Sequence, residues 1–419
     1  MSIRIQLLKL KLRLVHFLYG FITQHKPMLF TGKDASIQLC ENISHFGHKR
    51  VLIVTDAILV ELGILDKIKQ SLKDNGIEVF IYDGVLPNPT YAMVEEGVLI
   101  FNANNCDTIL AVGGGSPIDT AKAIILAECN PEKKAIELAG GYKSKRRPKP
   151  IFAIPTTAGT GSEVTLAAVI SHPETHEKMP LADHRTLPLA TAIDAELMQG
   201  MPPHVTAATG IDALTHAVES YISTGTNKFA DQYSRAAIKM IFEFLPRAYK
   251  DGSDLKAREA MGFAAFYAGY AFTQTLLGYV HGIAHQFGGL YGTPHGFANA
   301  LVLPHILDYS IVEAGPQFAE LAIVCGMGKE GEPEGELART FVDRVYALRR
   351  EVGIPDTLEA LQEKDIEKIA KAALKEAHTA YLVPRFMDKK TCEGIIRKLL
   401  PQEENTTSET AKQKTAEIA

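Results

Sequence analysis

The stretch TILAVGGGSPIDTAKAIILAE (residues 108–128) decides the fold class of this chain. It begins with a short apolar run typical of a buried strand, passes through three glycines, and continues with a helical composition. The runs VLIVTD (51–56), EVFIYDG (78–84) and IFAIPTT (151–157) are also strand-like, and helical segments lie between them at 64–75 and 91–104. Strands that alternate with helices predict an α/β domain with a mostly parallel, doubly wound sheet.

A change of composition follows residues 201–203, the sequence Met-Pro-Pro. Beyond it the segments are long, rich in alanine and helical in period, which predicts an all-α second domain. We expect an N-terminal basic amphipathic extension over 1–28, the α/β domain over 29–199, the helical domain over 200–402 and a disordered tail over 403–419.

Composition bears on the partners of the chain and on its cellular compartment. The chain has 419 residues, a net charge of −5 and five scattered cysteines. The charge gives no reason to expect a nucleic-acid partner. Cysteines that are odd in number and never paired as C-x-x-C indicate free thiols in a reducing compartment, so we expect a cytoplasmic protein.

The first 22 residues, MSIRIQLLKLKLRLVHFLYGFI, carry four basic residues and no acidic one. Cations interrupt every apolar run, so this is neither a membrane span nor a typical signal peptide. Three interpretations stay open: an element packed on the protein or a neighbouring subunit, a basic amphipathic contact with a membrane surface, or an organellar presequence.

Two loops after predicted strands suit a phosphate-bearing ligand. Gly113-Gly114-Gly115-Ser116 lies between a strand and a helix, where bare backbone N–H groups and the helix N-terminus favour an anion. It is not G-x-G-x-x-G, so it is also consistent with a simple tight turn. Residues 155–162, PTTAGTGS, form a second such loop, and two loops at one sheet edge indicate a nucleotide or dinucleotide. Asp56 suits either a ribose contact that favours NAD over NADP or a helix N-cap.

Histidines and an aspartate in the second half indicate a metal site. YVHGIAHQFGGLYGTPH (279–295) contains His281, His285 and His295, and IDALTHAVESY contains Asp212 and His216. Each i, i+4 pair places two side chains on one face of a helix, and we expect Gly288, Gly289 and Gly292 to break the helix and return His295 to the same point. Imidazoles with one carboxylate suit Fe(II), Zn or Mn, although each histidine alone is more often structural.

The chain resembles the iron-containing (group III) alcohol dehydrogenases, a family that includes lactaldehyde reductases and butanol dehydrogenases. The motifs that carry the resemblance are, in chain order, VLIVTD, YDGVLPNPT, AVGGGSPIDTAKAI, IPTTAGTGSEVT, ATGIDALTHAVESY and VHGIAHQFGGLYGTPHG. The resemblance runs from about residue 29 to residue 400. It implies an NAD-binding α/β domain, a helical metal-binding domain, and reversible hydride transfer between an aliphatic primary alcohol or its aldehyde and NAD(H), with Fe(II), or Zn(II) in its place, polarising the substrate oxygen. It also implies a homo-oligomer.

Matching motifs carry site residues over from this family. The implied metal ligands are Asp212, His216, His281 and His295, with His285 as a non-ligating proton relay. The implied cofactor contacts are Asp56, Asn88, Gly114, Gly115, Ser116, Thr156, Thr157, Thr160, Thr165 and Lys178. Ala167, Phe272 and Leu277 match substrate-pocket positions and imply an apolar cavity.

The chain departs from the family pattern near its end. The common Asn-Pro-Arg tripeptide appears as residues 383–385, Val-Pro-Arg, and bulky Tyr381 and Leu382 stand where small residues are usual. Two related activities stay open: a hydroxyacid–oxoacid transhydrogenase that retains its NAD, and a metal-dependent lyase of the dehydroquinate synthase type. A non-catalytic filament or membrane-associated protein is a third reading, suggested by the N-terminal segment.

Overall fold

A six-stranded parallel sheet forms the centre of the first half of the chain, in the order β1-β9-β6-β4-β2-β3. The computed structural model describes residues 26–172, 174 and 178–401. The strands are β1 (Met28–Thr31), β2 (Arg50–Val54), β3 (Glu78–Tyr82), β4 (Thr108–Gly113), β6 (Ile151–Pro155) and β9 (Ala190–Ile193). The predicted doubly wound α/β domain is confirmed.

Alternation along the strands explains why both faces of the sheet are covered. In β2, Leu52 belongs to one buried cluster, whereas Val51 and Ile53 belong to another. Successive side chains of a strand point to opposite faces, so a continuous apolar run needs a layer of helices on each side. The helices α5 (Tyr91–Ala103) and α6 (Gly115–Glu128) cover one face, and α2 (Ala35–His45) and α4 (Asp66–Asp74) cover the other.

The structure adds strands that the sequence did not predict. β1 and β9 extend the sheet, and a separate small sheet contains β5 (Gly140–Gly141), β7 (Ala167–Ser171) and β8 (Lys178–Ala182). The strand expected at 51–56 ends at Val54, and Asp56 instead caps the short helix α3 (Ala57–Glu61). Strand ends are set by pairing with neighbours, which a single run of residues does not reveal.

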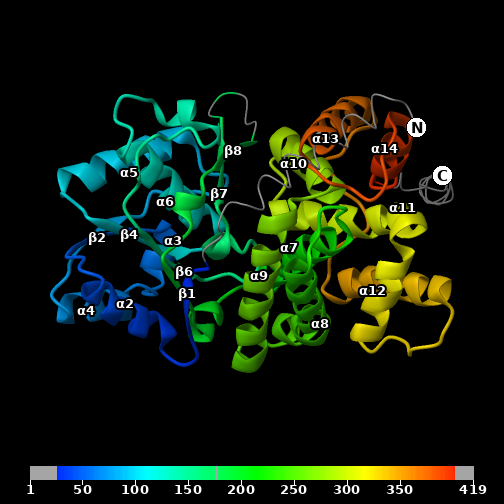
Figure 1. Ribbon diagram of the computed structural model, residues 1–419, viewed down its shortest axis with the longest axis horizontal. Coiled ribbons are helices and arrows are strands. Elements are labelled where there is room, and N and C mark those ends of the chain that lie inside the picture. Colours follow the sequence, from blue (N-terminus) through cyan, green and yellow to red (C-terminus); the bar gives the residue numbers. More distant parts are fainter. Residues whose placement is uncertain (1–25, 173, 175–177, 402–419) are drawn as a thin grey trace, which may run out of the picture.

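The second half of the chain is helical, as predicted, and Figure 1 shows it beside the α/β half. Its helices are α7 (Pro203–Ile222), α8 (Lys228–Lys250), α9 (Leu255–Thr275), α10 (Tyr279–Tyr291), α11 (His295–Val324), α12 (Glu334–Glu351), α13 (Ile366–Ala380) and α14 (Lys389–Arg397). One large hydrophobic cluster joins them. The buried core of this half therefore surrounds α7, α10 and α11, the helices that carry the predicted metal ligands.

The end of α10 corrects one prediction. Gly288 and Gly289 do not break the helix, which continues to Tyr291. Gly292 ends it in a left-handed conformation with φ 67°, which glycine adopts without the steric cost of a side chain. Pro294 then precedes the first turn of α11, so the chain reverses within three residues and His295 begins a new helix.

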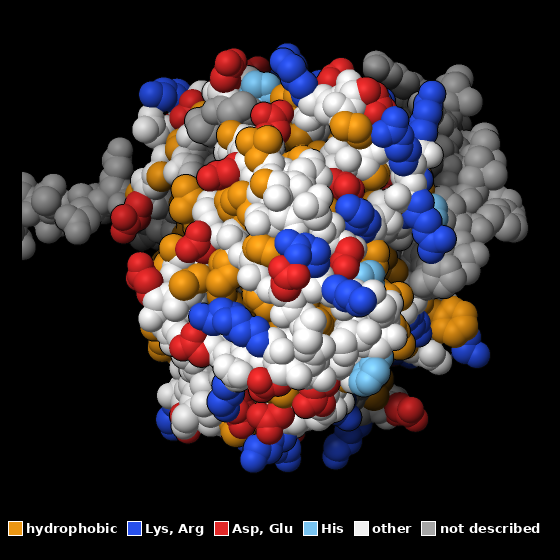
Figure 2. Space-filling view, turned by 90° about the vertical axis from the view of Figure 1, so that its left-hand side faces the viewer, with side chains coloured by type: hydrophobic (Ala, Val, Ile, Leu, Met, Phe, Trp, Pro, Cys, Tyr) orange, Lys and Arg blue, Asp and Glu red, His pale blue; other side chains and the backbone are white. Residues whose placement is uncertain are grey.

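Some predictions lie outside the described residues. These are the structure of the basic extension up to residue 25, its membrane contact through residues 1–22, and the disordered tail over 403–419. Within the described ranges, no helix is both long and apolar enough to span a membrane. Figure 2 shows the outer face of the α/β half, where basic and acidic side chains are interspersed.

Candidate active site

The four predicted metal ligands meet at one point. Asp212 and His216 lie one turn apart on α7, His281 lies in the first turn of α10, and His295 opens α11. One ligand atom from each lies within 4.8 Å of every other, and Asp212, His216 and His281 are buried. We call these four residues the metal cluster. Three helices from distant parts of the chain place these donors together.

Electrostatics in the metal cluster favour neutral rings. The Nε2 atoms of His216 and His281 face each other at 3.0 Å. Burial lowers the pKa of His216 to about 4 and that of His281 to about 3, although the Asp212 carboxylate opposes both shifts. Two neutral imidazoles with facing lone pairs and a nearby carboxylate are the donor set that a divalent transition metal takes. The residues present therefore fit such an ion.

Glu219, which the motif analysis missed, fixes the ring of His281. This buried carboxylate accepts hydrogen bonds from Nδ1 of His281 at 2.7 Å and from the backbone N–H groups of Gly278 and Val280. Because Nδ1 then carries the ring proton, Nε2 has no proton, and its lone pair is free to coordinate a metal ion. The only local signal was that Glu219 lies seven residues, or two helical turns, after Asp212.

Asn299, also missed, holds the carboxylate of Asp212. Its Nδ2 donates to Asp212 Oδ1 at 2.6 Å and lies 3.2 Å from Nε2 of both His281 and His295. The side chain is fully buried in the first turns of α11. Its i, i+4 spacing from His295 could have indicated that it faces the same point.

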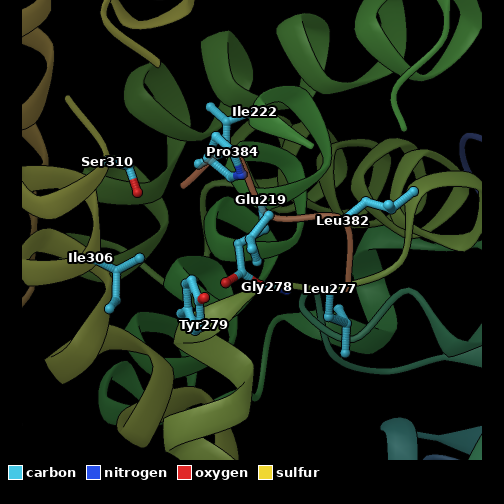
Figure 3. Close-up of a pocket in the computed structure, with 10 residues that line it drawn as sticks. Glu219, Ile222, Leu277, Gly278, Tyr279, Ile306, Ser310, Leu382 and Pro384 are labelled. Atoms are coloured by element: carbon cyan, nitrogen blue, oxygen red, sulfur yellow. The ribbon is translucent and has the colours of Figure 1, made fainter. Parts of the chain in front are cut away.

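The predicted substrate-pocket residues lie at different distances from the metal cluster. Phe272 stacks on His216, with ring centroids 4.2 Å apart. Leu277 lines a small cavity beside Glu219, and Figure 3 shows it there with Leu382. Ala167 lies on β7, in the α/β half.

His285 stands apart from the four clustered residues. Its ring stacks on that of His295, with centroids 5.4 Å apart, but its Nδ1 contacts Glu376 at 2.7 Å. Its side chain is 15% exposed, whereas that of His281 is 1% exposed. The equal spacing in the sequence could not separate these two histidines, and their partners on other helices do.

The two predicted cofactor loops, residues 113–116 and 155–162, touch each other. They follow β4 and β6, which are neighbours in the sheet. A Cβ atom on Gly115 would lie 2.7 Å from Thr160 Cγ2, and one on Gly114 would lie 3.2 Å from Thr157 Oγ1. A side chain at position 115 would therefore force Thr160 to shift, and glycine leaves the backbone N–H groups at the N-terminus of α6 bare, as an anion needs.

A buried lysine beneath these loops was missed. Lys122 on α6 donates from Nζ to Ser162 Oγ, Thr165 Oγ1 and the carbonyl oxygen of Ala167, at 2.8–3.0 Å. Burial lowers its pKa to about 8, opposed by Asp119. Lys122 therefore ties the helix of the first loop to the end of the second. Thr165, one of the implied cofactor contacts, is buried and bonded to this lysine.

The other predicted cofactor residues lie on several elements of the α/β half. Asp56 accepts a hydrogen bond from Leu59 N at 3.0 Å as the N-cap of α3. Asn88 is exposed with φ 57°. Burial lowers the pKa of Lys178 on β8, and the Asp212 carboxylate opposes this shift. A Cβ atom on Gly288 of α10 would lie 3.5 Å from Lys178 Cε, so this side chain reaches from β8 to the helix that carries His281. Ser116 is partly buried on α6, and Thr156 is buried after β6.

Known proteins resemble the chain along most of its length. The family model described as "Iron-containing alcohol dehydrogenase" matches residues 27–195, and "Fe-containing alcohol dehydrogenase family, C-terminal" matches residues 206–400. A lactaldehyde reductase from Escherichia coli (strain K12) is 40% identical over 83% of this chain and 91% of its own length. An NAD-dependent methanol dehydrogenase from Bacillus methanolicus is 37% identical over 84% of this chain and 93% of its own length.

Solved structures also match the fold of this chain along most of its length. A crystal structure of a 1,3-propanediol oxidoreductase, 39% identical in sequence, superimposes with a TM-score of 0.87 over 90% of this chain and 99% of that one. Both family models together cover more than half of the chain, and the relatives align over both the α/β and the helical half. The chain belongs to the iron-containing alcohol dehydrogenase family of oxidoreductases.

Proposed function

We propose that this chain is a metal-dependent alcohol dehydrogenase that uses NAD(H) to interconvert an aliphatic primary alcohol and its aldehyde. The observation that carries the proposal is the convergence of Asp212, His216, His281 and His295 within 4.8 Å. In this proposal iron is the resident ion and zinc the alternative. Residues 29–199 bind the dinucleotide and residues 200–402 bind the metal.

The proposal assigns substrate activation to the metal cluster. A divalent cation bound there supplies a Lewis acid, which lowers the pKa of an alcohol hydroxyl or polarises a carbonyl oxygen. Glu219 and Asn299 hold His281 and Asp212 in the orientation that such an ion needs. Phe272 covers one face of His216 and keeps water from that side of the ring.

Proton movement is assigned to His285. Its Nδ1 is bonded to Glu376, so Nε2 can accept the alcohol proton and release it to solvent through its partly exposed edge. The stacking of this ring on His295 keeps it beside the metal cluster. His285 is therefore near the reacting oxygen without being one of the four clustered donors.

Dinucleotide binding is assigned to the two glycine- and threonine-bearing loops. NAD, when bound, supplies the hydride acceptor for alcohol oxidation. The open N-terminus of α6 at Gly114, Gly115 and Ser116 suits a pyrophosphate. The acidic side chain of Asp56, at the end of the neighbouring strand, favours a ribose hydroxyl over a 2′-phosphate. The name of the methanol dehydrogenase relative, which includes NAD dependence, supports this assignment.

Anaerobic purification followed by elemental analysis and a rate series with C2–C12 primary alcohols tests the proposal. We expect iron near one equivalent per chain and NAD reduction that a chelator abolishes. An iron-loaded protein that oxidises none of these alcohols with NAD would contradict it. NAD that stays bound through dialysis, with turnover only when an oxo acid is added, would instead indicate the transhydrogenase.

A further inference from the structure

The partner of His285 is a carboxylate held from three sides. Glu376 lies on α13, which packs along α10. Its Oε1 atom lies 2.7 Å from Nδ1 of His285 and 2.5 Å from the hydroxyl of Tyr381. Its Oε2 atom accepts from Nε2 of Gln286 at 3.2 Å. Each contact joins residues that are not adjacent in the chain, so the arrangement depends on how α13 and the segment after it pack.

This geometry restricts the protonation of the ring. An imidazole nitrogen that faces a carboxylate carries the proton, and the other nitrogen is then the acceptor. Nδ1 of His285 faces Glu376, which leaves Nε2 without a proton in the neutral ring. Stacking on His295, with an interplanar angle of 18°, also fixes the plane of the ring.

Tyr381 fixes Glu376 in turn. Its side chain is almost fully buried, and burial together with the Glu376 carboxylate raises its pKa. The phenol therefore stays a donor, and its bond to Oε1 prevents rotation of the carboxylate away from His285.

We propose that Glu376, supported by Tyr381, is a positioning residue that holds His285 in the tautomer with a free Nε2 directed to the reacting alcohol. This inference rests on the proposed function, because it assigns the group that prepares the proton acceptor of that reaction. Glu376 acts through His285 and does not itself need to touch the substrate.

A double-mutant cycle between Glu376→Ala and His285→Ala tests whether the two residues act as one unit. We expect Glu376→Ala to lower kcat by about 10–100-fold with little change in KM, in the range seen when an outer partner of a functional histidine is lost. In the His285→Ala background the same change should have almost no further effect. An equal loss in both backgrounds would overturn the proposal, because it would show that Glu376 acts independently of His285.

Conservative variants separate positioning from folding. Glu376→Gln keeps an acceptor for Nδ1–H and should retain more of the rate than Glu376→Ala, whereas Tyr381→Phe should lose only a few-fold of kcat. Metal content and the Kd for NADH should match wild type in each variant. Glu367 is an exposed carboxylate on the same helix, paired with Lys389, and Glu367→Gln is the matched control with no expected effect. A Glu376→Gln variant as impaired as Glu376→Ala would count against the proposal.

The tautomer can be observed without turnover. In zinc-loaded protein labelled with ¹⁵N-histidine, the His285 signals, identified by their loss in His285→Ala, should show a protonated Nδ1 in wild type. They should shift toward a mixture or the opposite tautomer in Glu376→Ala. Wild-type protein with the proton on Nε2 would overturn the inference. This result would hold even if no alcohol were oxidised, so failure of the inference and failure of the proposed function remain distinguishable.

Discussion

The metal cluster and the cofactor loops offer different groups to a ligand: the cluster offers side chains, and the loops offer backbone. The cluster consists of side chains from three helices, and two of them are fixed by another buried residue: Glu219 holds His281, and Asn299 holds Asp212. The loops offer backbone, and glycines keep that backbone bare where Thr157 and Thr160 press against it. Removal of a side chain should therefore weaken metal binding at the cluster, whereas addition of a side chain should weaken NADH binding at the loops.

Loss of a cluster residue should have the largest effect. We expect His281→Ala to lose bound metal and to lower the rate by about 10³-fold, because several kcal/mol of transition-state stabilisation depend on the ion. The Kd for NADH should stay within roughly twofold of wild type, since the loops are a separate structure. His204→Ala, at an exposed position on α7, is the control. Full metal content in His281→Ala would remove this histidine from the site.

Glu219→Gln should have the next largest effect. The amide cannot accept the Nδ1–H bond of His281 as strongly as the carboxylate does, so the ring should lose its fixed orientation. We expect the affinity for Fe(II) to fall by about 10–100-fold, measured by competition with a chelator. Glu320→Gln, which alters a partner of Tyr221 away from the cluster, should bind metal normally.

Gly115→Ala tests the opposite behaviour of the loops. The new Cβ would lie 2.7 Å from Thr160 Cγ2, so the loops must separate, and we expect the Kd for NADH to rise by roughly tenfold, or ~1.4 kcal/mol. Adding Thr160→Ser, which deletes that methyl group, should restore binding. Gly141→Ala is the control, because its Cβ would meet no atom within 4 Å. Unchanged NADH binding in Gly115→Ala would show that the two loops do not hold the dinucleotide.

Asp56→Ser distinguishes two roles of Asp56: a negative charge beside the ribose of the dinucleotide, and the N-cap of α3. Serine keeps an N-cap acceptor for Leu59 N but removes the negative charge. If Asp56 faces the ribose, kcat/KM with NADP relative to NAD should rise by about tenfold, because repulsion of the 2′-phosphate is lost. An unchanged ratio would leave Asp56 as a helix cap alone.

Lys122→Met should give the smallest effect, a pH-dependent difference in Tm. Burial lowers the pKa of Lys122 from 10.5 to about 8, so between these values the unfolded chain binds more protons than the folded one. Wild-type stability relative to the variant should therefore rise from pH 8 toward pH 10.5 and stay level below pH 8. Thermal melts at pH 7, 8, 9 and 10 measure this, with Lys33→Met, at an exposed position, as control. If the difference in Tm between wild type and Lys122→Met did not change with pH, the lowered pKa of Lys122 would be contradicted.

Local patterns were enough for much of the fold. The apolar runs predicted β2, β3, β4 and β6, and the alanine-rich segments predicted the helical half. The sequence did not predict β1, β9 or the small sheet, because these short strands are defined by their neighbours and not by a strong pattern of their own. Gly288 and Gly289 were wrongly predicted to break α10, since packing outweighs their low helix propensity.

The contacts that Glu219 and Glu376 make with the histidines could not be predicted from spacing. Glu219 lies 62 residues from His281, and Glu376 lies 91 residues from His285. In the sequence, Lys122 is one charged residue in an apolar helix, yet it is fully buried and bonded to Ser162 of the second cofactor loop and to Ala167. Such contacts depend on the packing of whole helices, which no local period records.

By itself, the sequence determined four strands of the main sheet, the helical second half and the side chains that suit a divalent metal, because periodicity and donor chemistry are local properties. Spacing did not separate His281 from His285, and in the sequence only the family resemblance did. The tertiary structure alone gives the physical reason: His281 joins the metal cluster, and His285 turns to Glu376. His281 and His285 are one turn apart on the same helix and share a face. Their different positions follow from α7, α11 and α13. Glu219 of α7 is a buried partner of His281, whereas His285 contacts the partly exposed Glu376 of α13 and stacks on His295 of α11.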